Sequence, residues 1–338
     1  MQIALANNRQ ARRRVHVRPN LTIMKGTIAD LKFVRYGDMV VPVIMGKERR
    51  RVINHILPQG LNNFVNNIVA VNNTSQSGGS SISGWGSSPG NAIQLLNNGS
   101  VVQTLIPTVI PTLNGSTVIW VFIASDLSSA SYTANQVNLF VSVNYVNNLA
   151  FVSGGTVQYS PGFNLATATT NIVKQSGETI SFIWEIQLNL GSSALTDFIL
   201  GMLYSIPTLQ TQCYYSGSYY SGKVGTFAGT NAIGDVGPFY FSSITLQYLG
   251  GSSSSGLPSV TTSYDGTNTY LIISASITLS AQVTATSVII NVKSSGVYGF
   301  CVNEQLFTSG SVMQVPYNAT LQPGTYNVTV TIEFSPAT

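Results

Sequence analysis

The feature that most constrains the fold is a set of segments in which apolar and polar residues alternate. Every second residue is apolar in segment 136–145, and segments 179–188 and 326–334 repeat this pattern. Successive side chains of a β-strand point to opposite faces, so strict alternation predicts strands with one buried face. Val, Ile, Tyr, Phe and Thr, which favour such half-buried surfaces, are abundant. We therefore expect an all-β fold.

The spacing of the strand-like segments indicates how the strands are arranged. Turn signals at intervals of about 8–12 residues favour a β-sandwich or jelly roll over an open sheet. In one partition, a basic N-terminal arm at 1–74 precedes a jelly-roll-like domain at 75–250 and an immunoglobulin-like β-sandwich at 256–338. In the alternative, a double jelly roll divides the body near 150–175. The Gly/Ser run at 250–256 favours the first partition because such runs commonly link domains.

Charge is scarce and unevenly distributed. Only 8% of the residues are Asp, Glu, Lys or Arg, and residues 52–125 contain none. Residues 1–51 hold twelve basic and three acidic groups, a net charge of +9, whereas residues 52–338 hold three basic and eight acidic groups, a net charge of −5. A +9 segment attracts polyanions, so the N-terminal part is expected to meet a different environment from the body.

The N-terminal part also carries signs of ordered structure. Short extended segments are predicted at 21–28, 31–36 and 39–45. After the Pro58-Gln59-Gly60 break, a short helix is predicted because four apolar residues follow at helical spacing. They are Leu61, Phe64, Val65 and Ile68. Their apolar stripe would dock on the body, so the basic segment is expected to be an ordered anchor.

Groups that perform catalysis are few. The two histidines, His16 and His55, lie in or beside the basic segment, and the eight carboxylates of the body are scattered singly. A glycosidase pair formed by distant carboxylates is the remaining enzymatic alternative. The segment from Gly217 to Lys223 resembles a phosphate-binding loop, but Val224 replaces the hydroxyl that binds magnesium. We expect no enzymatic activity, no metal site and no cofactor.

Two basic clusters are the strongest candidate site. They consist of Arg9, Arg12, Arg13, Arg14 and Arg18, and of Lys47, Arg49, Arg50 and Arg51. Both could neutralise phosphates of nucleic acid or of an anionic membrane without sequence-specific contacts. Alternatively, these side chains could pair with carbonyls and carboxylates of adjacent subunits, because Arg is favoured at interfaces.

A second candidate is a Tyr-rich segment, with Tyr214, Tyr215, Tyr219 and Tyr220. Tyr gives a large contact area at modest entropic cost, so this segment is predicted to pack on a neighbouring subunit. Contact with a receptor or glycan is the alternative.

Targeting and crosslinking signals are weak. Charge interrupts every apolar run near the N-terminus, and the most apolar stretch, 117–124, is far shorter than the roughly 20 residues of a membrane-spanning helix. We therefore expect the chain to stay in the cytoplasm until it assembles. Cys213 and Cys301 are too few for a disulfide framework and are expected to be two buried thiols or one bridge.

The basic segment, the charge-poor β body and the lack of an export signal together resemble capsid proteins of icosahedral archaeal viruses, which use single or double jelly rolls. This resemblance is one of composition and carries over no functional residue. It implies a virion subunit that forms a large homo-oligomer, contacts other virion proteins, and anchors through its basic segment to viral nucleic acid, inner lipid or neighbouring subunits. The alternative is a turret, spike or adhesin that binds a receptor or glycan.

Overall fold

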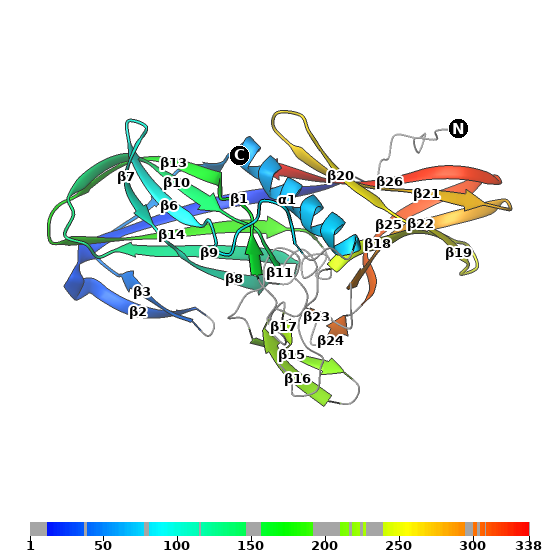
Figure 1. The fold of residues 1–338 in the computed structure, drawn as a ribbon, viewed down its shortest axis with the longest axis horizontal. Helices are drawn as coiled ribbons and strands as arrows, with labels where there is room; N and C mark the ends of the chain where they lie inside the picture. The colour runs from blue at the N-terminus through cyan, green and yellow to red at the C-terminus, as the bar shows by residue number, and fades with distance from the viewer. Residues whose placement is uncertain are drawn as a thin grey trace.

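The computed structural model describes residues 12–337 except 37–38, 78–80, 115, 147–156, 192–209, 216–217, 224–225, 228–238, 295–299, 303–304 and 308. In this part of the chain, strands dominate and a single α-helix is present. Two smaller sheets cover different parts of one large sheet in the manner of a β-sandwich (Figure 1). The expectation of an all-β fold is confirmed.

The largest sheet has eight strands and extends through both halves of the molecule (Figure 1). In spatial order it consists of β20 (Ser259–Tyr264), β21 (Thr269–Leu279), β26 (Gly324–Pro336), β1 (Arg12–Thr27), β14 (Glu178–Asn189), β9 (Thr117–Asp126) and β8 (Thr108–Asn114), with β4 (Glu48–Val52) also beside β1.

Strand β1 lies in the middle of this sheet. One of its edges pairs antiparallel with β14 over residues 17–27. Its other edge pairs in parallel with β26 over residues 12–17 and then antiparallel with β4 over residues 21–25. Because β26 and β14 are not themselves paired, β1 is the strand that joins the two halves of the sheet.

A five-stranded sheet covers one half of the large sheet. In spatial order it consists of β5 (Asn54–Ile56), β13 (Phe163–Lys174), β10 (Tyr132–Val141), β6 (Ala92–Asn97) and β7 (Ser100–Leu105). Phe182 and Trp184 of β14 are fully buried, as are Val137 and Leu139 of β10, and all four belong to one apolar cluster. The alternation predicted for segments 136–145 and 179–188 is thus used to bury one face of each strand.

A four-stranded sheet covers the other half. Its strands are β19 (Ser253–Gly256), β18 (Phe239–Tyr248), β22 (Val283–Ser294) and β25 (Ser309–Leu321). Phe241 and Ile290 of this sheet are fully buried, as are Leu271 and Phe334 of the large sheet. These residues belong to the same apolar cluster as Trp184, so one continuous core fills both halves.

The helix α1 (Pro58–Gln76) lies between the two halves (Figure 1). It packs against β13 on one side and β18, β20, β21 and β26 on the other. The predicted stripe is confirmed. Its four residues, Leu61, Phe64, Val65 and Ile68, are buried. The Asn72 side chain is also fully buried, and its Oδ1 accepts a hydrogen bond of 2.9 Å from the backbone N–H of Phe241 in β18.

The first turn of α1 approaches β13 closely at Gly60. A Cβ atom at this position would lie 2.1 Å from the carbonyl oxygen of Asn164 and 2.8 Å from Cα of Leu165. Both are backbone atoms, which cannot swing away as a side chain could. Glycine is therefore required here by the contact between helix and sheet.

Three smaller groups of strands complete the fold. The first is the hairpin of β2 (Leu31–Tyr36) and β3 (Met39–Ile44), which follows the short 3₁₀ helix η1 (Ile28–Asp30). The second pairs β11 (Asn144–Val146) with β12 (Val157–Tyr159). The third consists of β17 (Thr226–Phe227), β16 (Ser218–Lys223), β15 (Gln210–Tyr215), β24 (Gln305–Phe307) and β23 (Phe300–Val302).

The structure shows how the segments used for the predicted partition are arranged. The Gly/Ser run at 250–256 forms a tight turn and strand β19, which pairs with β18. Gly250 and Gly251 have φ angles of 96° and 89°, which favour glycine. Each of the three predicted parts, 1–74, 75–250 and 256–338, contributes strands to the large sheet. The domain boundaries, the jelly roll and the separate C-terminal domain stay predictions.

Replacing Gly60 tests the contact between α1 and β13. Alanine is a better helix former than glycine by about 1 kcal/mol, so an exposed helix would be stabilised by the change. Here we expect Gly60→Ala to destabilise the protein by about 1–3 kcal/mol, because the new methyl group overlaps backbone atoms. Urea unfolding followed by tryptophan fluorescence measures the change. Gln59→Ala, at an exposed neighbouring position, is the control and should change stability by less than about 0.5 kcal/mol.

Candidate functional site

The first basic cluster is built into β1 by an alternation of Val with basic residues. In the sequence Arg14-Val15-His16-Val17-Arg18, the two valines are 0% and 3% exposed and belong to the core. The intervening Arg14, His16 and Arg18 are exposed on the opposite face of the sheet. Side chains two apart on a strand lie about 6.6–6.8 Å from one another along it. The strand thus presents three basic side chains in a row from a fixed backbone.

This row borders an open depression of about 380 Å³. The other residues that line it are Thr117, Gln187, Asn189 and Gly191. Gln187 is the direct neighbour of Arg18 in the pairing of β1 with β14. Guanidinium, imidazole and amide groups can all donate hydrogen bonds, and two fixed arginines add positive charge. The depression can therefore accept an anionic oxygen-rich group such as a phosphate or carboxylate.

The two arginines of this row differ in their contacts. Arg14 Nε donates a hydrogen bond of 3.2 Å to Oε1 of Glu333, a β26 residue that is only 1% exposed. Ser335 Oγ donates to the same oxygen over 3.1 Å. Arg18 forms no ion pair with any residue in the described ranges. Arg14 therefore also stabilises the junction of β1 with β26, whereas Arg18 has no such role among the described contacts.

The second basic cluster lies beside the same strand, in and next to β4. By register, Arg50 shares a face with Ile23, and Arg49 shares the opposite face with Met24. Arg50 reaches the five-stranded sheet, where its Nη2 donates to Thr170 Oγ1 over 2.8 Å and to the carbonyl oxygen of Asn171. Arg50 thus links the two sheets at their open edge.

A depression of about 480 Å³ lies at this edge. It is lined in part by Lys25, Lys47, Arg49 and Arg50. Lys25 Nζ lies 2.9 Å from Oε2 of Glu178. A backbone hydrogen bond from Gln175 and then the hydrogen bond with Lys25 hold the pKa of Glu178 below its usual value. This carboxylate and that of Glu48, which also lines the depression, offset two positive charges, and the remaining lysine and arginine side chains leave the edge basic.

The structure brings both predicted clusters to one strand and its neighbour. Arg14, Arg18, Lys47, Arg49, Arg50 and Arg51 are exposed. Arg12 and Arg13 belong to β1, but their side chains lie outside the described part of the chain. Arg9 lies outside the described residues altogether. Sequence reasoning missed His16 and the partner Glu333. The alternation from Arg14 to Arg18 could have revealed His16, whereas nothing local indicates a contact between residues 319 positions apart.

The Tyr-rich segment forms the hairpin of β15 and β16. Tyr214 pairs with Tyr219, and Cys213 pairs with Tyr220. Because directly opposed residues share a face, Tyr214 and Tyr219 are neighbours on this hairpin. The side chains of Tyr214, Tyr215, Tyr219 and Tyr220 lie outside the described part of the chain, so a subunit, receptor or glycan contact there stays a prediction.

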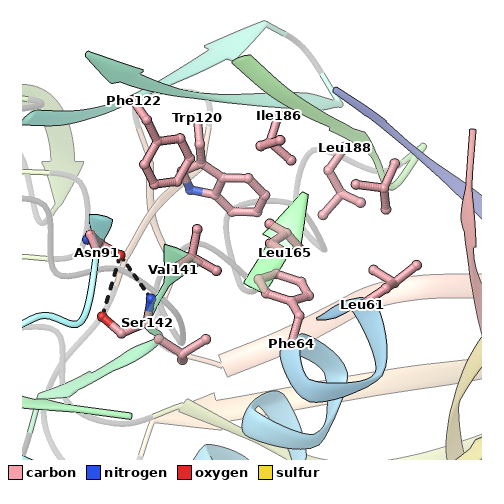
Figure 2. Close-up of a pocket in the computed structure, with 12 residues that line it drawn as sticks. Leu61, Phe64, Asn91, Trp120, Phe122, Val141, Ser142, Leu165, Ile186 and Leu188 are labelled. Atoms are coloured by element: carbon pink, nitrogen blue, oxygen red, sulfur yellow. Dashed lines mark hydrogen bonds between the residues drawn. The ribbon is translucent and has the colours of Figure 1, made fainter. Parts of the chain in front are cut away.

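An apolar cavity of about 30 Å³ lies in the core near the first turn of α1 (Figure 2). Phe64 and Trp120 meet edge to face beside it, with ring centroids 5.8 Å apart. Asn91 Oδ1 accepts hydrogen bonds from the backbone N–H and the Oγ of Ser142 at its rim. Pockets for small molecules usually exceed about 300 Å³, whereas this space suits about one or two waters. It is a packing gap between helix and sheets.

The buried ion pair of the body, Lys174 and Asp126, is a structural clamp. Lys174 is 1% exposed, and its Nζ donates to the carbonyl oxygens of Ser128 at 2.6 Å and Ala130 at 2.8 Å. Oδ2 of Asp126 lies 3.8 Å from this nitrogen. Burial raises the pKa of Asp126, but hydrogen bonds from Ser128 outweigh it and keep the pKa below its usual value. Because Lys174 and Asp126 both form hydrogen bonds with residues of the β9–β10 loop, the pair holds this loop on β13.

No group of three or more His, Cys, Asp and Glu residues in the described ranges could hold a metal ion. None of the helices described is long and apolar enough to cross a membrane.

Comparison with known proteins gives no match. No family model, no curated protein sequence and no solved structure matches this chain.

The different contacts of Arg14 and Arg18 lead to different expected effects on stability. We expect Arg14→Gln to lower the free energy of unfolding by about 1–3 kcal/mol, because the buried Glu333 loses a charged hydrogen-bond donor. Arg18→Gln is expected to change it by less than about 0.5 kcal/mol. Urea unfolding at neutral pH compares the two variants. Equal losses would show that Arg14 does not support the sheet in this way.

The buried clamp gives a second stability prediction. Lys174→Met leaves the carboxylate of Asp126 buried without its cation, so we expect a loss of about 3–5 kcal/mol. Combining Lys174→Met with Asp126→Asn removes both charges and should recover part of this loss. Urea unfolding of both single variants and the double variant measures the coupling. Substitutions at ordinary surface positions change stability by about 0.5 kcal/mol. A loss below about 1 kcal/mol for Lys174→Met would therefore contradict a structural role of the ion pair.

Proposed function

We propose that the protein is a structural subunit of a virus shell, built as a jelly-roll-type body with a C-terminal β-sandwich. It self-assembles through its β faces and anchors to an anionic component of the virion through the basic residues of β1 and β4. The proposal assigns the chain no catalytic activity. Its partners are further copies of the chain and other virion proteins.

The row of exposed basic residues on β1 is the observation that carries the proposal. Arg14, His16 and Arg18 are held by a strand whose other face is in the core, so their backbone positions are fixed before a ligand binds. A pre-organised cationic row loses less entropy on binding than a disordered tail of equal charge. An anchor of this kind transmits force directly to the central strand of the subunit.

The outer face of the β21–β26 pair supports assembly through neutral contacts. Hydroxyl and amide side chains pair across the two strands, namely Ser274 with Thr329, Ser276 with Asn327, and Thr278 with Thr325. A charge buried in an interface needs a partner, whereas these groups retain hydrogen bonds when water is excluded. Such a face suits dense packing of identical subunits.

A turret, spike or adhesin subunit is the second candidate. The pairing of Tyr214 with Tyr219 favours it, because a hairpin with adjacent tyrosines is suited to contact a receptor or glycan. Binding of the full chain to a glycan array, lost on Tyr214→Ser with Tyr219→Ser, would favour this function over the shell.

Assembly and polyanion binding of the full chain test the first proposal. We expect large particles or sheets in electron micrographs and concentration-dependent light scattering. On a heparin column, Arg18→Gln should elute at lower salt than the unchanged protein, because it binds the polyanion through one cation fewer. For nucleic acid, each lost phosphate contact reduces the slope of log K against log salt concentration by about 0.7–0.9. Lys293→Gln, which removes an exposed cation from the other half of the molecule, is the matched control and should not shift elution. A chain that stays monomeric and passes through heparin unretained would overturn the proposal.

A further inference from the structure

The β2–β3 hairpin packs one face on the large sheet. Val34, Val41 and Val43 pack with Met24 and its neighbours in a small apolar cluster on the side of the sheet opposite the main core. By register, Val34 is opposite Val41, so the inward residues of the two strands share one face. The hairpin is held in place by this cluster and by the hydrogen bond of 2.8 Å from the backbone N–H of Ile44 to Ser181 Oγ.

The other face of the hairpin is apolar as well. Register places Phe33 opposite Pro42, and Arg35 opposite Val40, on the side turned away from the sheet. Phe33 is 71% exposed and Val40 is 57% exposed. A sheet with one face on the core normally has a polar outer face. We call Phe33, Arg35, Val40 and Pro42 the hairpin face.

Basic residues lie on and near the hairpin face. Arg35 belongs to it, and Lys47 is exposed near its base, whereas Lys32, which is also exposed, is opposite Val43 on the side of the hairpin turned towards the sheet. Both lysines act on Asp30, whose pKa is held low chiefly by hydrogen bonds from Thr27 and additionally by these two positive charges. Two further apolar residues are exposed beside Asp30, Ile28 at 61% and Met45 at 50%. Exposed apolar side chains interspersed with cations are typical of surfaces that lie at a membrane interface.

We propose that the hairpin face docks on an anionic lipid bilayer, which makes lipid the anionic component of the proposed function on which this inference rests. Phe33 and Val40 enter the boundary between headgroups and acyl chains, while Arg35 and Lys47 meet acidic headgroups. Each basic residue near such a surface, and the apolar area removed from water, contribute to binding.

Two other occupants fit the hairpin face less well. Nucleic acid would satisfy the cations, but its phosphates offer nothing to Val40, and Phe33 is the single exposed aromatic side chain of the described hairpin. A second copy would cover the apolar side chains, but a symmetric contact would bring the Arg35 side chains of both copies together. Acidic lipid matches both the apolar and the cationic groups.

Vesicle flotation of the full chain tests the inference. We expect binding to vesicles of phosphatidylcholine mixed with phosphatidylglycerol, and much weaker binding to phosphatidylcholine alone. Phe33→Ser combined with Val40→Ser should lower the affinity about 10-fold or more, because most of the inserted apolar area is lost. Leu249→Ser combined with Leu257→Ser is the matched control, since these residues are 75% and 81% exposed in the other half of the molecule and should leave binding unchanged.

A Phe33→Trp variant reports insertion directly. Its additional emission should shift to shorter wavelength on acidic vesicles, and a lipid carrying a quencher in its acyl chain should reduce it. Unchanged emission, equal binding of the hairpin variant, or preference for DNA over vesicles would overturn the inference. A hairpin variant that alters the oligomeric state without vesicles would also overturn it and would identify the face as a subunit contact. Vesicle binding by a chain that never assembles would leave the inference intact and contradict the shell subunit instead.

Discussion

The pairing of β1 on both of its edges is the constraint on which the rest of the structure depends. Its neighbours β14 and β26 belong to different halves of the molecule and are not paired with each other. The apolar residues of β1 complete the core between them, and α1 fills the junction on the same side. A chain without this strand would retain two incomplete sheets with open edges, which are prone to pair with other chains.

The same strand supports the core and carries the proposed anchor site because its two faces are chemically distinct. Val15 and Val17 fix the strand in the core, and this fixes the direction of Arg14, His16 and Arg18 on the opposite face. The buried Glu333 then distinguishes the two arginines, since it accepts a hydrogen bond from Arg14 and not from Arg18. Several basic residues of the N-terminal segment, among them Arg14, Arg18 and Lys25, thus lie in the central strand of the large sheet.

Local patterns predicted the local elements. Alternation identified β10, β14 and β26, and the spacing of Leu61, Phe64, Val65 and Ile68 identified α1, because each element buries one face. Long-range pairing could not be predicted, since no local pattern indicates that Arg14 lies beside Glu333. The Gly/Ser run at 250–256 illustrates the same limit. Its composition suits a linker and a turn equally, and in the structure it forms a turn whose following strand, β19, pairs with β18.

The parallel pairing of β1 with β26 has a consequence for synthesis of the chain. Paired residues of the two strands are 319 positions apart in the sequence, so the large sheet cannot close until residues 331–336 have left the ribosome. Until then β1 can pair only with β14 and β4, and the edge of residues 12–17 that later pairs with β26 stays open. Folding is therefore slow to finish and is completed by a contact of very high sequence separation. A chain cut before residue 331 would lack the part of β26 that pairs with β1, so it could not complete the large sheet.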